Sequence, residues 1–312
     1  MDLETLKNNV SFFKTANHIK RLTKGFSPDH KYIVSDQNGI KYLFRTADLE
    51  HFERKKLEFE IMKDIEKLRV RSPKTYEIGK IKDLGICYYI LSYIEGEDAR
   101  DKLPEYSAEI QYKIGLEAGR DLAKMNTYPA PSLILEWSEH IYKKYNRYLE
   151  AYKTCGIKLR NDEKIIHFIE ENKHYLMGRP NCFQHDDFHV GNIIVIDENY
   201  AGVIDFNRFD WGDPIFDFVK VALFSREISI PFSIGQINGY YEGEIPENFW
   251  RLYSIYVAMS IFACVVWSKD YTPELLDEML NRLYMVLEDH RYFEYTEPQW
   301  FKDGIGITQE VQ

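Results

Sequence analysis

A short polar segment near the middle of the chain carries most of the residue types that can do chemistry. It contains His185, Asp187 and Asn192, and a further carboxylate, Asp205, lies a little beyond it. Short apolar runs flank these polar residues. Carboxylate and amide oxygens are the ligands that a hard cation such as Mg²⁺ prefers. The segment is therefore a candidate site for a metal ion and for proton transfer.

Two β-prone runs follow Asn192, at residues 193–196 and 201–204, and they predict a β-hairpin with a four-residue loop at 197–200. Counting back from such a loop places Asn192 opposite Asp205. Directly opposed side chains of an antiparallel pair have Cβ atoms roughly 4.5–5.5 Å apart. An amide oxygen and a carboxylate at that separation can bind one Mg²⁺ ion. We therefore predict that Asn192 and Asp205 are metal ligands.

Asp187 lies five positions before Asn192, on the loop that leads into the predicted hairpin. A carboxylate there can orient an attacking hydroxyl and accept its proton, whereas His185 is expected to fix the loop by hydrogen bonding. The spacing His-x-Asp-x-x-x-x-Asn, then a hairpin, then Asp is that of a kinase catalytic loop. The alternative is a transition-metal cluster of a hydrolase, formed by His185, Asp187 and His189. The kinase spacing explains more residues at once.

The first ninety residues are rich in predicted strands. Residues 32–35 and 40–44 flank Asn38-Gly39, a strong hairpin signal, and residues 86–94 read as a further strand. A helix lies between these strands, with an expected inward stripe of Leu57, Ile61, Met62, Ile65 and Leu68. This region predicts an antiparallel sheet with a helix.

Beyond a polar linker at 95–98, helical periodicity dominates. The longest apolar stretch, 252–267, is too short to span a membrane and predicts a buried core helix. The chain is therefore expected to be α+β, with domains at 1–94 and 95–312.

These motifs resemble those of the aminoglycoside phosphotransferase and choline kinase family, two-lobed relatives of protein kinases. The resemblance rests on His185, Asp187, Asn192 and Asp205, and on the segment 211–217, which is similar to the family's Gly-Asp-Pro-x-x-Asp signature. The space between Asp205 and this segment is too short for a long activation loop, which favours a small-molecule kinase. The resemblance implies a kinase-like fold, with a nucleotide-binding first lobe and a helical second lobe containing the catalytic loop, metal site and acceptor region.

The resemblance also implies nucleotide-binding residues in the first lobe. Arg45 ends a strand where the family places a Lys or Arg facing the phosphates. Its ion-pair partner is expected to be Glu58 rather than Glu60, because Glu58 flanks the inward stripe of the following helix. Ser27 either contacts a phosphate or belongs to a simple turn. The hinge that meets the purine edge is expected at Ser92, Tyr93 and Ile94.

Three further positions have local interpretations. Asn126 stands where relatives commonly have His, at a position expected to support structure. Asn207 replaces the glycine of the protein-kinase Asp-Phe-Gly motif, which is frequent in this family. Asp213 is predicted to be a helix N-cap, with Pro214 in the first turn.

Composition limits the partners and the compartment. The net charge of −10 argues against general nucleic-acid binding, which depends on Lys and Arg neutralising phosphates. The four cysteines are scattered, which fits a reducing compartment, and residues 1–10 lack the apolar core of a signal peptide. A cytoplasmic protein without membrane or nucleic-acid partners is expected.

The implied reaction transfers the γ-phosphoryl group of ATP or GTP, with Mg²⁺, to a hydroxyl of a small molecule. The resemblance puts aminoglycoside antibiotics first among the acceptors. The acidic chain is compatible with such a polycationic acceptor, and carboxylates such as Glu227, Asp270 and Glu274 are available to meet it. The alternative is a metabolic kinase acting on choline, ethanolamine, homoserine or a sugar. A non-catalytic nucleotide-binding module is a third possibility, and the intact set of catalytic polar residues speaks against it.

Overall fold

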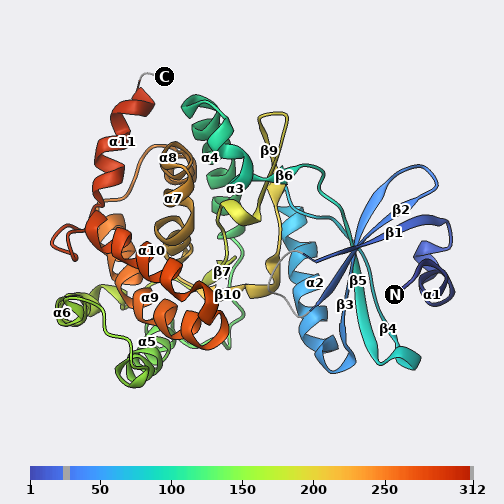
Figure 1. The fold of residues 1–312 in the computed structure, drawn as a ribbon, viewed down its shortest axis with the longest axis horizontal. Coiled ribbons are helices and arrows are strands. Elements are labelled where there is room, and N and C mark those ends of the chain that lie inside the picture. The colour runs from blue at the N-terminus through green and yellow to red at the C-terminus, as the bar shows by residue number, and fades with distance from the viewer. Residues whose placement is uncertain (24–28, 310–312) are drawn as a thin grey trace. The chain divides into compact units, whose positions relative to one another are not determined.

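The computed structural model describes residues 1–23 and 29–309, and these residues form two compact units (Figure 1). The first unit comprises Met1–Gly96 and Ala201–Asn207, and the second comprises Glu97–Tyr200 and Arg208–Gln312. The sequence predicted a boundary after residue 94 and assigned every later residue to the helical lobe. The structure differs in that the segment containing Asp205 packs with the first unit.

A five-stranded antiparallel sheet with the order β1-β2-β3-β5-β4 forms the centre of the first unit. Its elements are α1 (Leu3–Asn9), β1 (Ala16–Leu22), β2 (His30–Asp36), β3 (Lys41–Asp48), α2 (Phe52–Lys67), β4 (Thr75–Ile81) and β5 (Ile86–Ser92). The predicted hairpin at Asn38-Gly39 is confirmed. Gly39 has φ +81°, and Asp36 Oδ1 accepts hydrogen bonds from the N–H groups of Asn38 and Ile40.

The two faces of this sheet differ in chemistry. Because side chains alternate along a strand, Phe44 and Arg45 on β3 point to opposite faces. The face of Phe44 is an aromatic and aliphatic core that α1 covers with Leu6. The face of Arg45 carries charged side chains and meets Glu58 of α2. The sheet thus places Arg45 on the side of α2.

Helix α2 buries Ile61, Met62 and Ile65 of the predicted stripe, but the buried face is centred differently from the prediction. Leu57 is 51% exposed, whereas Glu58 is 2% exposed. The buried positions of the helix are Lys55, Glu58, Phe59, Ile61, Met62 and Ile65. At 100° per residue these positions form one arc, and Leu57 lies outside it. The helix therefore turns a carboxylate toward the sheet and exposes a leucine.

The second unit is mainly helical, as the sequence predicts. Its helices are α3 (Ala99–Lys102), α4 (Ala108–Met125), α5 (Trp137–Thr154), α6 (Asp162–Asn172), α7 (Arg226–Ile228), α8 (Ile230–Tyr241), α9 (Phe249–Tyr271), α10 (Leu276–Asp289) and α11 (Gln299–Gln309). Two small sheets accompany them, pairing β7 (Cys182–Gln184) with β10 (Asp210–Gly212), and ordering β6 (Glu97–Asp98), β8 (Ile193–Ile196) and β9 (Asn199–Val203) as β6-β8-β9. The small sheets frame the polar segment.

Helices α4 and α8 pack closely through glycines. A Cβ atom at Gly239 of α8 would lie 2.1 Å from the carbonyl oxygen of Leu116 on α4. No side chain fits at that distance, so the contact requires glycine. The C-terminal end of α4, which carries Asn126, is thereby held firmly in the unit.

Helix α9 is long and apolar enough to cross a membrane by length and composition, with a mean hydropathy of 1.6 in its most apolar window. However, 72% of that window is buried inside the second unit. The helix therefore has the burial of a core helix, as the sequence predicted for residues 252–267.

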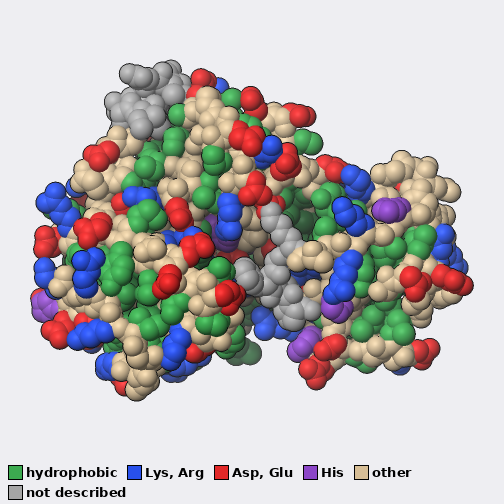
Figure 2. All heavy atoms as spheres, viewed as in Figure 1, with side chains coloured by type: hydrophobic (Ala, Val, Ile, Leu, Met, Phe, Trp, Pro, Cys, Tyr) green, Lys and Arg blue, Asp and Glu red, His purple; other side chains and the backbone are tan. Residues whose placement is uncertain are grey.

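Charged side chains are mixed on the surface. On the face shown in Figure 2, Lys and Arg side chains are interspersed with Asp and Glu side chains. Many are joined in helical pairs, such as Lys113 with Glu109. The net charge of −10 is thus not concentrated in a single acidic patch on this face.

Candidate active site

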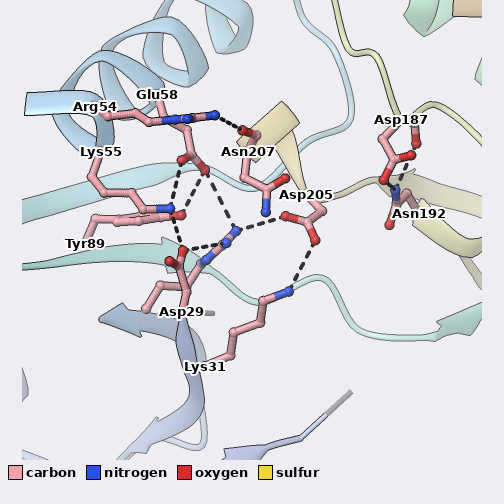
Figure 3. Close-up of polar contacts among 11 residues, drawn as sticks. Asp29, Lys31, Arg54, Lys55, Glu58, Tyr89, Asp187, Asn192, Asp205 and Asn207 are labelled. Atoms are coloured by element: carbon pink, nitrogen blue, oxygen red, sulfur yellow. Dashed lines mark hydrogen bonds and ion pairs between the residues drawn. The ribbon is translucent and has the colours of Figure 1, made fainter. Parts of the chain in front are cut away.

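The catalytic-loop candidate Asp187 is held by hydrogen bonds within the second unit. The loop runs from the end of β7 to a 3₁₀ turn, Val190–Asn192, that leads into β8. Asn192 Nδ2 donates to Asp187 O at 2.8 Å and to Asp187 Oδ2 at 3.1 Å (Figure 3). His185 is completely buried, and its ring packs edge-on against Phe188. The loop thus brings Asp187 and Asn192 together.

His189 supplies a second contact to Asp187. The N–H of Gly191 donates to His189 Nδ1 at 3.0 Å, which assigns the ring proton to Nε2. Nε2 lies 3.5 Å from Asp187 Oδ1. Burial lowers the pKa of His189, so that the ring is neutral at neutral pH. A neutral His189 therefore orients the carboxylate of Asp187 by donating a hydrogen bond to it.

Lys220 keeps Asp187 ionised. Its Nζ lies 3.8 Å from Oδ1 of Asp187 and 3.8 Å from Oδ1 of Asp186. Burial alone would raise the pKa of Asp187, but His189, Lys220 and Arg208 outweigh it and hold this pKa well below its usual range. Lys220 was not predicted from the sequence, where its only signal is its position three residues after Asp217.

Asp217 fixes the backbone of the catalytic loop. It is fully buried, and its carboxylate accepts hydrogen bonds from the N–H of Asp186 at 2.8 Å and of His185 at 3.2 Å. Asn126 Nδ2 donates to the same carboxylate at 3.1 Å and to Phe183 O at 2.7 Å. Burial raises the pKa of Asp217 to about 7. The expectation that Asn126 supports structure agrees with these contacts.

The predicted N-cap at Asp213 is confirmed. Its carboxylate accepts from the N–H of Ile215 at 3.1 Å and from Tyr256 OH at 2.7 Å, and Arg179 binds both of its oxygens. The segment that follows is a 3₁₀ turn, Pro214–Phe218, and then a π-helical turn, Val221–Ser225. Lys220 lies between the two turns. The contact with the loop thus comes from a stretch of irregular helix, and π-turns are frequent at functional sites.

In the first unit, Arg45 lies at the centre of a buried cluster of charges. Its Nη2 donates to Asp29 Oδ2 at 2.8 Å, and its Nη1 lies 3.8 Å from Glu58 Oε1. Lys55 Nζ contacts the same two carboxylates, at 2.6 Å and 3.5 Å, and Tyr89 OH donates to Glu58 at 2.9 Å. Glu58 therefore lies beside Arg45, whereas Glu60 is exposed on the other face of α2.

Asp205 joins this cluster from the segment 201–207. Its Oδ1 accepts from Arg45 Nη1 at 3.1 Å, and its Oδ2 lies 3.2 Å from Lys31 Nζ (Figure 3). Burial raises the pKa of Asp205, but Arg45 and Lys31 outweigh this effect and lower it. The residue has φ +67°, and the N–H of Val203 donates to Arg71 O. Asp205 is therefore an ionised carboxylate fixed to the first unit.

The hairpin differs from the one predicted. Its loop has two residues, Asp197 and Glu198, instead of four, and both have positive φ, as in a type I′ turn. Neither candidate metal ligand lies in a strand of the hairpin: Asn192 precedes the first residue of β8, and Asp205 follows the last residue of β9. The predicted cross-strand register is therefore wrong. The roles of Asn192 and Asp205 as metal ligands remain proposals.

The remaining nucleotide candidates fall into two groups. Ser27 lies outside the described residues. Of the three hinge residues, Ser92 donates its N–H to Lys74 O and Tyr93 donates its N–H to Lys41 O. Ile94 is the next residue along the chain.

Four residues of the charged cluster were not predicted from the sequence: Lys31, Asp29, Lys55 and Tyr89. Only the register of the β2–β3 hairpin could have indicated Lys31.

Comparisons with known proteins agree with the fold and the motifs. A family model described as the phosphotransferase enzyme family matches residues 18–250. No curated protein matches the chain. Similar solved structures include a GDP complex of a mutant aminoglycoside 2′-phosphotransferase-IIIa, with a TM-score of 0.69 and 14% identity over 95% of this chain and 100% of that one.

Two other structures are similar to a comparable degree. A ternary complex of aminoglycoside phosphotransferase APH(4)-Ia with AMP-PNP and hygromycin B has a TM-score of 0.67 and 15% identity, covering 92% of this chain and 98% of that one. A gentamicin complex of APH(2″)-IIa has a TM-score of 0.62 and 17% identity, covering 90% and 94%. The fold is thus that of the kinase-like phosphotransferases.

The chain belongs to the phosphotransferase enzyme family. Enzymes of this class transfer a phosphoryl group to an alcohol group of a small molecule.

Proposed function

We propose that this enzyme transfers the γ-phosphoryl group of ATP or GTP to a hydroxyl of a small molecule, with Asp187 as the catalytic base. The observation that carries the proposal is the state of Asp187, which Asn192 and His189 orient and Lys220 keeps ionised. An ionised, oriented carboxylate can accept the proton of an attacking hydroxyl. Since the transition state is loose, such positioning supplies much of the catalysis.

Asn192 and Asp205 are proposed as ligands of Mg²⁺, and the chemistry of their donors fits a hard cation. Asn192 uses its Nδ2 for both bonds to Asp187, so its amide oxygen is the atom that can coordinate a cation. Asp205 offers an ionised carboxylate. When bound, Mg²⁺ neutralises charge on the nucleotide's phosphates.

The purine edge is proposed to meet the hinge at Ile94. Because the N–H groups of Ser92 and Tyr93 are donated to carbonyls of Lys74 and Lys41, Ile94 N–H is the donor assigned to the purine among these three residues. Structures similar to this chain were solved with GDP, with ADP and with AMP-PNP. Both ATP and GTP therefore belong in the assay.

Aminoglycosides are the first acceptor class to test. Structures similar to this chain contain gentamicin, streptomycin and hygromycin B. The enzyme is expected to act in the cytoplasm, where its nucleotide donors are abundant, and its four cysteines are free thiols.

A second acceptor class, neutral sugars or homoserine, is favoured by the cations around Asp187. Lys220 lies beside Asp187, and Lys144 Nζ lies 3.8 Å from Asp186. These lysines balance the charges of Asp186 and Asp187, so this part of the loop offers a polycationic acceptor little net negative charge. Among the carboxylates predicted for a polycation, Glu227 is already bound by Arg282 at 2.6 Å. This arrangement suits a metabolic kinase whose acceptor carries few positive charges.

A coupled assay of ADP or GDP release tests the proposal. The acceptor panel contains aminoglycosides, neutral sugars, homoserine, choline and ethanolamine, each with ATP and with GTP. Acceptor-dependent release supports phosphoryl transfer, and the acceptor that gives the highest kcat/KM identifies the class. Nucleotide binding without acceptor-dependent release would contradict the proposal and indicate a non-catalytic nucleotide-binding module.

A further inference from the structure

The residue predicted to face the nucleotide's phosphates, Arg45, is already occupied by carboxylates. Its two terminal nitrogens contact Asp29, Glu58 and Asp205, and its guanidinium carbon lies 5.3 Å from the ring centre of Tyr89. Its side chain is only 3% exposed. The terminal N–H groups of a guanidinium held in this way point toward carboxylates of the protein. Turning it toward a ligand would leave Asp29 and Glu58 as buried charges with fewer partners.

Lys31 reaches Asp205 from the neighbouring strand. It lies directly opposite Arg45 in the β2–β3 pair, so both side chains emerge on the same face of the sheet. Lys31 and Arg45 contact different oxygens of Asp205. Figure 3 shows Lys31 approaching Asp205 from the side away from Glu58. The Lys31 side chain is 15% exposed, compared with 3% for Arg45.

The two cations differ in what would hold them once Asp205 coordinates a metal ion. Arg45 would keep Asp29 and Glu58. Among the described residues, Asp205 is the only carboxylate within ion-pair distance of Lys31. The ammonium group would then be released beside the metal ligand, on a flexible four-carbon stem. A lysine in that situation binds phosphate as a mobile point charge.

We propose that Lys31 is the residue of the first unit that binds the nucleotide's phosphates, and that Arg45 is a positioning residue that fixes Asp205. This assignment rests on the proposed function, since it requires a nucleotide and a metal ion at Asp205. It transfers to β2 a role that the sequence assigned to β3. Lys31 therefore exchanges one anion, Asp205, for another, a phosphate oxygen.

The test measures binding without turnover. Isothermal titration calorimetry compares Mg²⁺–AMP-PNP and Mg²⁺–GMP-PNP with adenosine and guanosine, for the wild type and for Lys31→Met. The variant keeps the length of the side chain and removes its charge. We expect binding of the preferred triphosphate analogue to weaken about 10- to 100-fold, as for the loss of one charge-assisted hydrogen bond. Binding of the matching nucleoside should stay within about twofold of wild type.

Two control variants separate the role of Lys31 from general effects of charge. Lys67→Met removes an exposed lysine whose side chain is 70% accessible, and triphosphate binding should not change. Lys31→Arg keeps a cation and should recover most of the affinity. Thermal unfolding of each variant checks that the first unit remains folded, and retained nucleoside binding provides the same check in the calorimeter.

The outcomes distinguish this assignment from the proposed function. If the wild type binds the triphosphate analogue and Lys31→Met binds it within twofold, the assignment is overturned and the proposed function stands. If the wild type binds neither analogue with Mg²⁺, both are overturned. A selective loss of triphosphate affinity in Lys31→Met, recovered by Lys31→Arg, supports the assignment.

Discussion

Replacing Asp217 by asparagine should loosen the catalytic loop while keeping the shape of the side chain. In the wild type, Oδ1 accepts from the N–H of Asp186, and Oδ2 accepts from the N–H of His185 and from Asn126 Nδ2. Asparagine offers one acceptor oxygen and one NH₂ group. In its better orientation the oxygen keeps two of the three donors, and the N–H of Asp186 then faces an NH₂ group.

The size of the effect follows from these three bonds. One buried N–H without an acceptor costs about 1–3 kcal/mol, and the two remaining bonds lose their charge-assisted strength. Relief of the buried charge offsets part of this loss, so we expect the free energy of unfolding to fall by about 2–4 kcal/mol. Asp187 adjoins the released N–H of Asp186, and a displacement of about 1 Å can lower kcat by about 10²-fold.

The assay combines urea unfolding, followed by tryptophan fluorescence, with kcat for the best acceptor. Asp289→Asn is the matched control, because Asp289 is also a buried carboxylate of the second unit, but it pairs with Arg226 and does not contact the loop. It should lower stability and leave kcat close to wild type. An Asp217→Asn variant that loses stability but keeps wild-type kcat would refute the role assigned to Asp217.

Three further predictions concern pH dependence, packing and the first unit. The pKa of Asp217 is raised from 3.8 to about 7, so between these pH values the folded state binds a proton that the unfolded state does not. In urea unfolding, the stability advantage of the wild type over Asp217→Asn should therefore shrink from pH 5 to pH 8. An advantage that grows over this range would contradict the raised pKa. Gly239→Ala should cost about 1–3 kcal/mol or more in thermal unfolding, because its Cβ would meet Leu116 O; an unchanged melting temperature would exclude that close packing. Glu58→Gln should lower unfolding free energy by about 2–4 kcal/mol and the exposed Glu60→Gln by less than about 0.5, and equal effects would contradict the inward position of Glu58.

Local signals in the sequence were sufficient for the elements that short-range chemistry determines. Asn38-Gly39 gave the β2–β3 hairpin because its residues tolerate positive φ, and Asp213-Pro214 gave a capped turn. The choice of Glu58 over Glu60 was correct, although the stripe used to argue it wrongly included Leu57. Because neighbouring helix positions differ by 100°, misplacing one residue at the edge of the stripe did not change the choice between Glu58 and Glu60.

Three features were missed, each for a different reason. The hairpin after Asn192 was predicted to have a four-residue loop, whereas its loop has two residues. Asp197 and Glu198 are not the Asn-Gly pair that is typical of a type I′ turn. Lys220 reaches Asp187 from between a 3₁₀ turn and a π-helical turn, which no local signal in the sequence indicates. Lys31 needed the register of a strand pair, which the hairpin at Asn38-Gly39 could have supplied. Of the three, only the contact of Lys220 with Asp187 depends on tertiary packing rather than on local signals.

The role of Asp187 as the catalytic base is tested by measuring transfer of labelled phosphate from [γ-³²P]ATP or GTP to the best acceptor by Asp187→Asn. Asp186→Asn is the control, because Asp186 also faces Lys220, and asparagine tolerates its φ of +52°. We expect Asp187→Asn to abolish transfer while nucleotide affinity stays near wild type, and Asp186→Asn to retain most activity. Substantial transfer by Asp187→Asn would contradict its assignment as the catalytic base.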